Sequence, residues 1–159
     1  MEKLIIICVD DQREVLASLR KDLEIFIPYC SVFDCESADE TTEVLEEIES
    51  EGNEPALIIC DHVMPGKSGI EFLIELSNDP RFAKIRKLLL TGLATQQDTI
   101  QAINDAQIDY YLEKPWEKEN LIQIVKKLLS RFVISAGIEF KPYLKILDQE
   151  VLYEKLRQS

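Results

Sequence analysis

Short apolar segments alternate along this chain with longer segments whose apolar residues recur every three or four positions. The short segments have the length and composition of buried strands, and they cover residues 4–9, 31–35, 57–60, 88–90 and 109–113. The longer segments have the periodicity of amphipathic helices, and they cover residues 12–26, 38–51, 69–77, 96–106 and 119–132. In the segment 96–106 we expect Ile100, Ile103 and small residues to face inward, which would anchor that helix only thinly.

Five strand–helix repeats of this length are typical of βαβ units. Because crossovers between parallel strands are right-handed, the repeats predict an α/β fold, with a five-stranded parallel sheet and helices on both faces. The third strand is followed at once by Asp61, Pro65, Gly66 and Gly69, so the chain turns sharply there. Asp61 is therefore expected at the carboxyl end of a buried strand, where open parallel sheets bind ligands.

The last part of the chain forms no sixth repeat. Gly137 and Pro142 interrupt it, and residues 143–156 have helical spacing. We therefore divide the chain into a domain of residues 1–131 and a helical extension of residues 132–159. The extension would pack on the preceding helix, pair with a second copy in a homodimer, or lead into an effector domain.

Composition narrows the function. The 159 residues suffice for one domain, and no apolar run reaches the roughly 18 residues of a membrane span. The first residues lack the features of a signal peptide, so we expect a cytoplasmic protein without a membrane partner. The net charge of −12 argues against direct binding of nucleic acid. The four cysteines form no C-x-x-C pair and are expected to be reduced core thiols.

Polar residues end the predicted strands: Asp10 and Asp11, then Asp61, Thr91 and Lys114. Parallel strand ends converge on one crevice, so these side chains should meet there. Clustered carboxylates raise each other's pKa unless a cation neutralises them, and oxygen ligands suit Mg²⁺. One carboxylate could then act as nucleophile toward a phosphoryl group, with the lysine and threonine positioning and neutralising it.

The segments VDDQ, CDHVMPGKSG, LLLTG and YYLEKPW stand in that order at the strand ends. Together they resemble the receiver domain of two-component response regulators over roughly residues 4–130. The resemblance implies a flavodoxin-like sheet with strand order 2-1-3-4-5. It also implies phosphorylation by a sensor histidine kinase or a phosphotransfer protein, and no enzymatic activity beyond the domain's own phosphoryl transfer and autodephosphorylation.

The same resemblance assigns the metal site. Asp61 matches the phosphoacceptor. Asp11 and Asp61 should ligate Mg²⁺ directly, Asp10 mostly through water, and the backbone carbonyl of Val63 should complete the protein ligands. The side chains of Val63 and Leu93 are apolar where many relatives carry polar ones, so we hypothesise slow autodephosphorylation. An unchanged phosphate lifetime after Val63→Asn with Leu93→Glu would contradict that hypothesis.

The switch residues also follow from the resemblance. Thr91 should hydrogen-bond one phosphoryl oxygen and Lys114 another, and Pro115 matches a cis proline that aims the lysine. Tyr111 matches the aromatic residue that turns inward when the threonine moves. That motion would change the surface of the fourth helix, fifth strand and fifth helix, and so control partner binding or dimerisation. Trp116, beside the proline, is expected to cover apolar surface.

Two alternatives belong to other classes. The first is a conventional enzyme or cofactor binder on the same sheet. A haloacid-dehalogenase-type phosphatase needs a D-x-D motif, whereas Asp10 and Asp11 are adjacent. A flavodoxin or dinucleotide binder needs a Gly- or hydroxyl-rich loop, whereas the loop after the first strand is acidic. A binding module that keeps the fold without phosphorylation stays open. A beryllofluoride or acetyl phosphate titration separates it from a phosphorylated switch.

Overall fold

The computed structural model describes residues 2–92 and 96–158, and its core is one parallel sheet. The strand order is β2-β1-β3-β4-β5, as the sequence predicts. The strands are β1 (Leu4–Val9), β2 (Cys30–Cys35), β3 (Leu57–Asp61), β4 (Arg86–Thr91) and β5 (Tyr110–Glu113). The predicted flavodoxin-like fold is confirmed.

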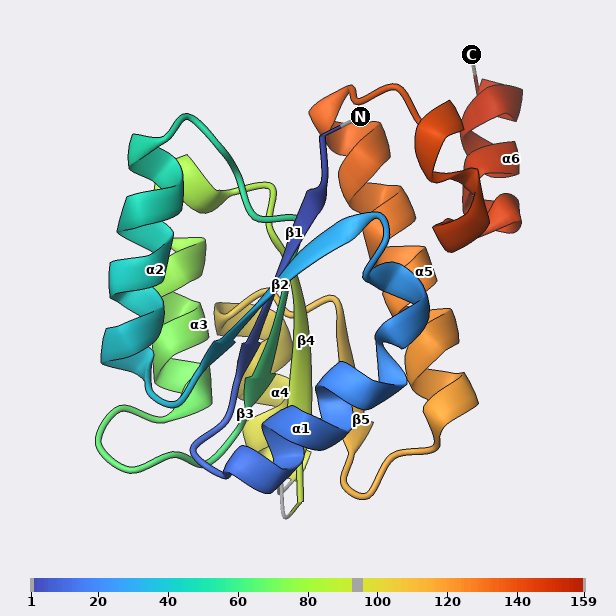
Figure 1. Cartoon of the computed structure of the whole chain (residues 1–159). Helices are drawn as coiled ribbons and strands as arrows, with labels where there is room; N and C mark the ends of the chain where they lie inside the picture. The colour runs from blue at the N-terminus through green and yellow to red at the C-terminus, as the bar shows by residue number, and fades with distance from the viewer. Residues whose placement is uncertain (1, 93–95, 159) are drawn as a thin grey trace.

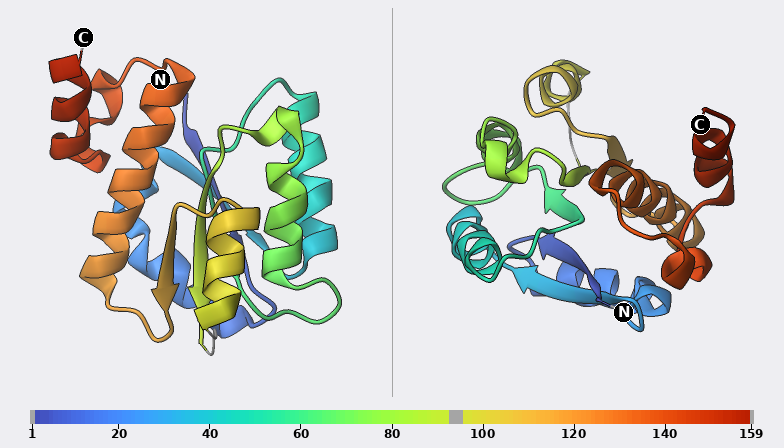
Figure 2. Two further views of the ribbon diagram at one scale, coloured as in Figure 1. Left: turned by 180° about the vertical axis from the view of Figure 1, so that it is seen from behind. Right: turned by 90° about the horizontal axis from the view of Figure 1, so that it is seen from above.

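Helices cover both faces of the sheet (Figures 1 and 2). The helices are α1 (Arg13–Asp22), α2 (Ala38–Ser50), α3 (Gly69–Ser77), α4 (Gln96–Asp105), α5 (Lys118–Ala136) and α6 (Gln149–Gln158). Short 3₁₀ turns occupy Glu24–Phe26, Pro80–Phe82 and Lys141–Ile146. One buried cluster lies between the sheet and α1 with α5, and a second lies between the sheet and α2, α3 and α4.

The central strands are apolar along their whole length because helices cover them on both faces. All five residues of β3 are buried. The helices that follow β2 and β3 begin at serines: the hydroxyl of Ser37 accepts from the Glu40 N–H, and that of Ser68 accepts from the Glu71 N–H. Such N-caps fix the residue at which each helix starts. None of the described helices is long and apolar enough to span a membrane.

Helix α4 agrees with the prediction for its small residues but not for its two isoleucines. The side chains of Ile100 and Ile103 are 51% and 49% exposed, whereas Ala102 and Ala106 are fully buried. The expectation that the isoleucines face inward is therefore wrong. Both pairs have helical spacing, and the small alanine face is the one that packs inward toward α3. Thin anchoring of α4 stays a prediction, which the small apolar area of alanine side chains favours.

Helix α5 is five residues longer than predicted, one at its start and four at its end. It continues past Phe132 to Ala136 and ends at Gly137, whose φ of +69° gives the left-handed C-cap that favours glycine. The following segment is a 3₁₀ turn and then α6, rather than one helix from residue 143. The division of the chain at residue 131 stays a prediction, and α5 crosses that position without a break.

The extension packs on the preceding helix, whereas its pairing with a second copy and its continuation into an effector domain stay predictions. Helix α6 lies outside α5, away from the sheet (Figures 1 and 2). The backbone N–H of Asp148 donates to the buried Ser130 hydroxyl of α5 at 2.7 Å, and the Tyr143 hydroxyl donates to the Glu2 carbonyl. We call this contact region the tail junction, with its buried residues Ser130, Tyr143, Ile146, Leu147 and Leu152.

Candidate functional site

Strand alternation brings the charged strand-end residues to one side of the sheet. Side chains two residues apart in a strand point to the same face. Cys8 packs in the cluster beneath α1 and α5, and Asp10 continues that row beyond β1. In the same way Ile59 leads to Asp61 in β3, and Leu112 leads to Lys114 beyond β5. The alternation therefore brings two carboxylates and one ammonium together at the same end of the sheet.

The ammonium of Lys114 bridges two carboxylates. Its Nζ lies 2.8 Å from Asp10 Oδ2 and 2.8 Å from Asp61 Oδ1. The lysine backbone is anchored next to the sheet, because its N–H donates to the Thr91 carbonyl at 2.9 Å. The peptide bond to Pro115 is cis. We call Asp10, Asp11, Asp61, Thr91 and Lys114 the acidic site.

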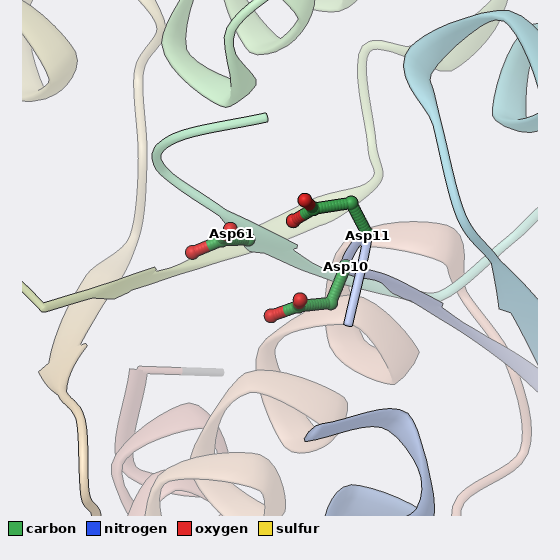
Figure 3. A group of neighbouring side chains, drawn as sticks. All are labelled: Asp10, Asp11 and Asp61. Atoms are coloured by element: carbon green, nitrogen blue, oxygen red, sulfur yellow. The ribbon is translucent and has the colours of Figure 1, made fainter. Parts of the chain in front are cut away.

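Three carboxylates meet at the ends of β1 and β3 (Figure 3). One oxygen from each of Asp10, Asp11 and Asp61 lies within 4.8 Å of the others. Asp10 is fully buried and Asp61 is 6% exposed, whereas Asp11 faces solvent. A single ammonium leaves this group with an excess of negative charge. Closely spaced oxygen ligands open to water on one side are the donor set that suits Mg²⁺.

The pKa shifts of Asp61 and Lys114 reflect the excess of negative charge in the acidic site. Burial raises the pKa of Asp61, and the charge of Asp10 raises it further, against the opposing effect of the Lys114 hydrogen bond. Burial alone would lower the pKa of Lys114, but its hydrogen bonds to the two carboxylates outweigh burial and raise it. The site therefore keeps the lysine charged and makes a second cation favourable.

Thr91 ends β4 with an unused hydroxyl. Its side chain is 3% exposed, and its Oγ1 has no hydrogen-bond partner among the residues that the structure describes. A buried hydroxyl without a partner is unfavourable, and native proteins contain few of them. The hydroxyl is thus available to a ligand atom that arrives at this end of the sheet.

Gly69 is a residue that sequence reasoning read only as part of a turn. A Cβ at this position would lie 1.8 Å from the Asp61 carbonyl oxygen. The Gly69 N–H donates to the His62 carbonyl at 2.9 Å, and the His62 N–H donates to the Leu90 carbonyl at 2.8 Å. The loop therefore returns onto the end of β3 before α3 begins. Glycine after a strand-end acid signals a turn, but nothing local signals so close an approach.

The other predicted site residues lie at the surface around this cluster. Val63 is 66% exposed and Tyr111 is 43% exposed. Tyr111 lines a hollow of about 680 Å³ between α4 and α5, together with Ile103 and Trp116. Leu93, which entered the hypothesis on phosphate lifetime, lies outside the described residues.

The cysteines take no part in the site. All four are free and buried, which confirms the prediction of reduced core thiols. Burial raises the pKa of Cys35 to about 11 and that of Cys30 to about 12. Thiols with such pKa values are protonated at neutral pH, and metal binding and nucleophilic attack need the thiolate.

Comparison with known proteins agrees with the geometry. Residues 6–126 match the family model of the response regulator receiver domain. The chain is 32% identical over 123 residues to the hydrogenase transcriptional regulatory protein HoxA of Cupriavidus necator, covering 77% of this chain and 23% of that protein. It is 31% identical over 130 residues to the response regulator Rre1 of a Synechocystis species, covering 82% of this chain and 53% of that protein.

Solved structures show the same fold. The signal receiver domain of a signal transduction histidine kinase from Syntrophus aciditrophicus superposes with a TM-score of 0.68 at 26% identity, covering 79% of this chain and 89% of that one. The chain thus spans about a quarter to a half of the two regulators and nearly all of an isolated receiver domain. With the matching family model, the parallel sheet and the three strand-end carboxylates, this chain belongs to the receiver domain family of two-component response regulators.

Proposed function

We propose that Asp61 accepts a phosphoryl group, in a Mg²⁺-dependent reaction, from a sensor histidine kinase or a phosphotransfer protein. A carboxylate oxygen of Asp61 attacks the phosphorus atom and forms a P–O bond. The P–N bond of the donor phosphohistidine breaks, and its electron pair stays on the imidazole nitrogen, which takes up a proton from solvent. The chain itself turns over no other substrate.

The observation that carries this proposal is the contact between Lys114 and Asp61. The ammonium lies 2.8 Å from one oxygen of Asp61 and is held from the other side by the fully buried Asp10. A cation fixed beside the nucleophile can pair with a phosphoryl oxygen as negative charge gathers there. The buried hydroxyl of Thr91 offers a hydrogen bond to a second phosphoryl oxygen.

The carboxylates fit the metal that this reaction needs. Both oxygens of Asp10 already accept hydrogen bonds, one from the Gln12 N–H at 2.8 Å and one from Lys114. Asp11 and Asp61 would therefore hold the ion directly, with Asp10 acting through water and the Val63 carbonyl as a further protein ligand. When bound, Mg²⁺ supplies positive charge that neutralises the carboxylates and the transferred group.

The proposed output is a change of the α4–β5–α5 surface. Modification of Asp61 draws Thr91 toward the phosphoryl group, and Tyr111 turns inward into the space left. Helix α4 buries Ala102, and Ala106 is buried directly after its last residue, whereas Ile100 and Ile103 are half exposed. We therefore expect it to be the most easily displaced element of this surface. The altered surface then binds an effector or a second copy of the chain.

The phosphoryl group is expected to be long-lived. The side chain of Val63, two residues after Asp61, is apolar and largely exposed. It cannot hydrogen-bond a water molecule for attack on the phosphorus. Val63→Asn should therefore shorten the phosphate lifetime, measured as the decay of phosphorylated protein after removal of the donor.

Acetyl phosphate tests the proposed function directly. Incubation with acetyl phosphate and Mg²⁺ should increase the intact mass by one phosphoryl group, and light scattering on the same sample reports any change of oligomeric state. EDTA or Asp61→Asn should abolish the mass increase, whereas Asp39→Asn, a matched change on the exposed surface of α2, should preserve it. An unmodified mass, with no response to beryllofluoride, would favour a binding module that does not use phosphorylation.

A further inference from the structure

Trp116 makes a polar contact that the sequence does not reveal. It is the chain's single tryptophan and lies two residues after Lys114, in the loop between β5 and α5. Its indole Nε1 donates a hydrogen bond to Asp22 Oδ2 at 2.8 Å, although 94 positions separate the two residues. The ring is half-buried and packs against the core beneath α1 and α5. The contact ties the loop to the end of α1.

The loop runs along one side of α1. Glu14, Ser18 and Asp22 are spaced by four residues and so share a face of that helix. Together with Lys114 and Trp116 they line a groove of about 440 Å³. Helix α1 begins directly after the acids of β1, so its first turn lies by the acidic site and Asp22 lies at its far end. The loop therefore connects the acidic site to the last residue of α1.

Lys114 needs its backbone to be fixed on both sides. Its long side chain has many rotamers, and the ammonium reaches Asp10 and Asp61 together only from a restricted backbone position. Upstream, its own N–H is bonded to the Thr91 carbonyl at 2.9 Å. Downstream, Glu117 is the N-cap residue of α5 but makes no side-chain cap hydrogen bond. The Trp116–Asp22 bond supplies the missing restraint on that side.

The position of Asp22 is informative in itself. The C-terminal end of a helix disfavours a negative charge. Asp22 is the last residue of α1, so its carboxylate does not stabilise that helix through the dipole. It instead accepts a charge-assisted hydrogen bond from the indole, a strong and directional interaction.

We propose that Trp116 and Asp22 are positioning residues that hold Lys114 between Asp10 and Asp61. This inference rests on the proposed phosphorylation of Asp61. Neither residue touches the phosphoryl group; they act through the backbone of the loop that carries the lysine. Loss of the bond lets the ammonium leave its place beside Asp61 and leaves the metal-binding carboxylates unchanged.

The test uses the full chain with acetyl phosphate at saturating Mg²⁺. Trp116→Phe removes the donor but keeps a ring, and Asp22→Ala removes the acceptor. Each should slow phosphorylation about tenfold, since small misplacement of a reacting group has effects of this size. Asp22→Asn keeps an acceptor oxygen and should stay within about twofold of the unsubstituted rate, and the double variant should be no slower than either single one.

Magnesium affinity separates positioning from general damage. Calorimetric titration with Mg²⁺ should give an affinity no weaker than that of the unsubstituted chain for all of these variants, because Asp10, Asp11 and Asp61 are intact. Ser18→Ala, on the same face of α1, is the matched control and should keep the unsubstituted rate.

Phosphorylation of folded Trp116→Phe and Asp22→Ala at the unsubstituted rate would overturn the positioning role and leave the phosphoacceptor function standing. The positioning role would also be overturned if Asp22→Asn were phosphorylated slowly, or if Mg²⁺ affinity fell in proportion to the phosphorylation rate of the variants. Absence of phosphorylation in the unsubstituted chain would instead refute the proposed function.

Discussion

The acidic site and the tail junction lie at opposite ends of the sheet and are built from opposite kinds of interaction. The acidic site gathers three carboxylates around one ammonium and leaves the Thr91 hydroxyl without a partner among the described residues. The tail junction buries apolar side chains such as Ile146 and Leu152, and its main polar contact, at Ser130, is satisfied. The acidic site thus provides reactive groups at a cost in folding stability, whereas the tail junction contributes only to folding stability.

This difference predicts two separable sets of variants. Removal of the Asp61 charge from the acidic site should abolish phosphorylation without lowering the free energy of unfolding, because the clustered carboxylates repel one another. Changes in the tail junction should lower the free energy of unfolding without altering phosphorylation. Each of the following experiments measures both quantities, by intact mass after acetyl phosphate treatment and by urea denaturation.

Asp61→Asn should produce the largest effect. Phosphorylation should be lost completely, because the amide is not a nucleophile toward phosphorus. The free energy of unfolding at neutral pH should rise, since burial raises the pKa of Asp61 and the folded state therefore disfavours its charge. The sign follows from linkage: a carboxyl whose pKa is raised in the folded state loses stability as the pH rises from the ordinary aspartate pKa through the raised folded-state pKa. A lower free energy of unfolding would contradict the view that this end is electrostatically strained.

Gly69→Ala should lower the free energy of unfolding and slow phosphorylation together, unlike variants confined to one of the two sets. The added methyl group would lie 1.8 Å from the Asp61 carbonyl oxygen, so the end of β3 must move. We expect a loss of about 3 kcal/mol in the free energy of unfolding, with at least a tenfold slower phosphorylation. Gly92→Ala is the matched control, because a Cβ there meets nothing within 4 Å. A fully stable Gly69→Ala would show that the loop can relax around the methyl group.

Ile146→Ala should affect stability alone. Ile146 is 1% exposed against α5, and truncation of a buried isoleucine costs about 2.5 kcal/mol. Leu144→Ala in the same 3₁₀ turn removes a side chain that is 46% exposed and should cost less than about 1 kcal/mol. Phosphorylation should proceed at the unsubstituted rate in both variants. Slower phosphorylation of Ile146→Ala would show that the two ends of the sheet are coupled.

The sequence predicted the acidic site better than the tail junction, for a physical reason. A buried strand and the acid that ends it are local features, and parallel strands always bring such ends together. Asp61 and Lys114 therefore met as expected. The partners Trp116 and Asp22 are joined by packing between distant segments, and no local pattern marks either of them.

Helix α4 and the tail illustrate the same limit. The isoleucines of α4 were wrongly predicted to face inward with the small residues, because Ile100 with Ile103 and Ala102 with Ala106 both fit helical spacing, and only the neighbouring helix distinguishes them. The pattern after residue 142 predicted a helix, but not that Asp148 would divide it into a 3₁₀ turn and α6. Packing across the chain decided both cases.

Ser130→Ala should have the smallest effect and the most specific one. Ser130 is fully buried in α5; its hydroxyl donates to the Lys126 carbonyl and accepts from the Asp148 N–H, both at 2.7 Å. Its removal leaves the Asp148 N–H without its acceptor at the start of α6, which should cost about 1.5 kcal/mol. Phosphorylation should not change.

The matched change for this last comparison is Ser135→Ala on the same helix. The Ser135 hydroxyl lies at the surface, where water can replace it as the acceptor for Arg86. Its loss should therefore cost less than about 0.5 kcal/mol. Hydrogen exchange then localises the effect, because Ser130→Ala should speed exchange of the α6 amides and leave β1 and β3 protected. Equal costs for the two serines would mean that the buried hydrogen bond between Ser130 and Asp148 contributes nothing to the stability of the tail junction.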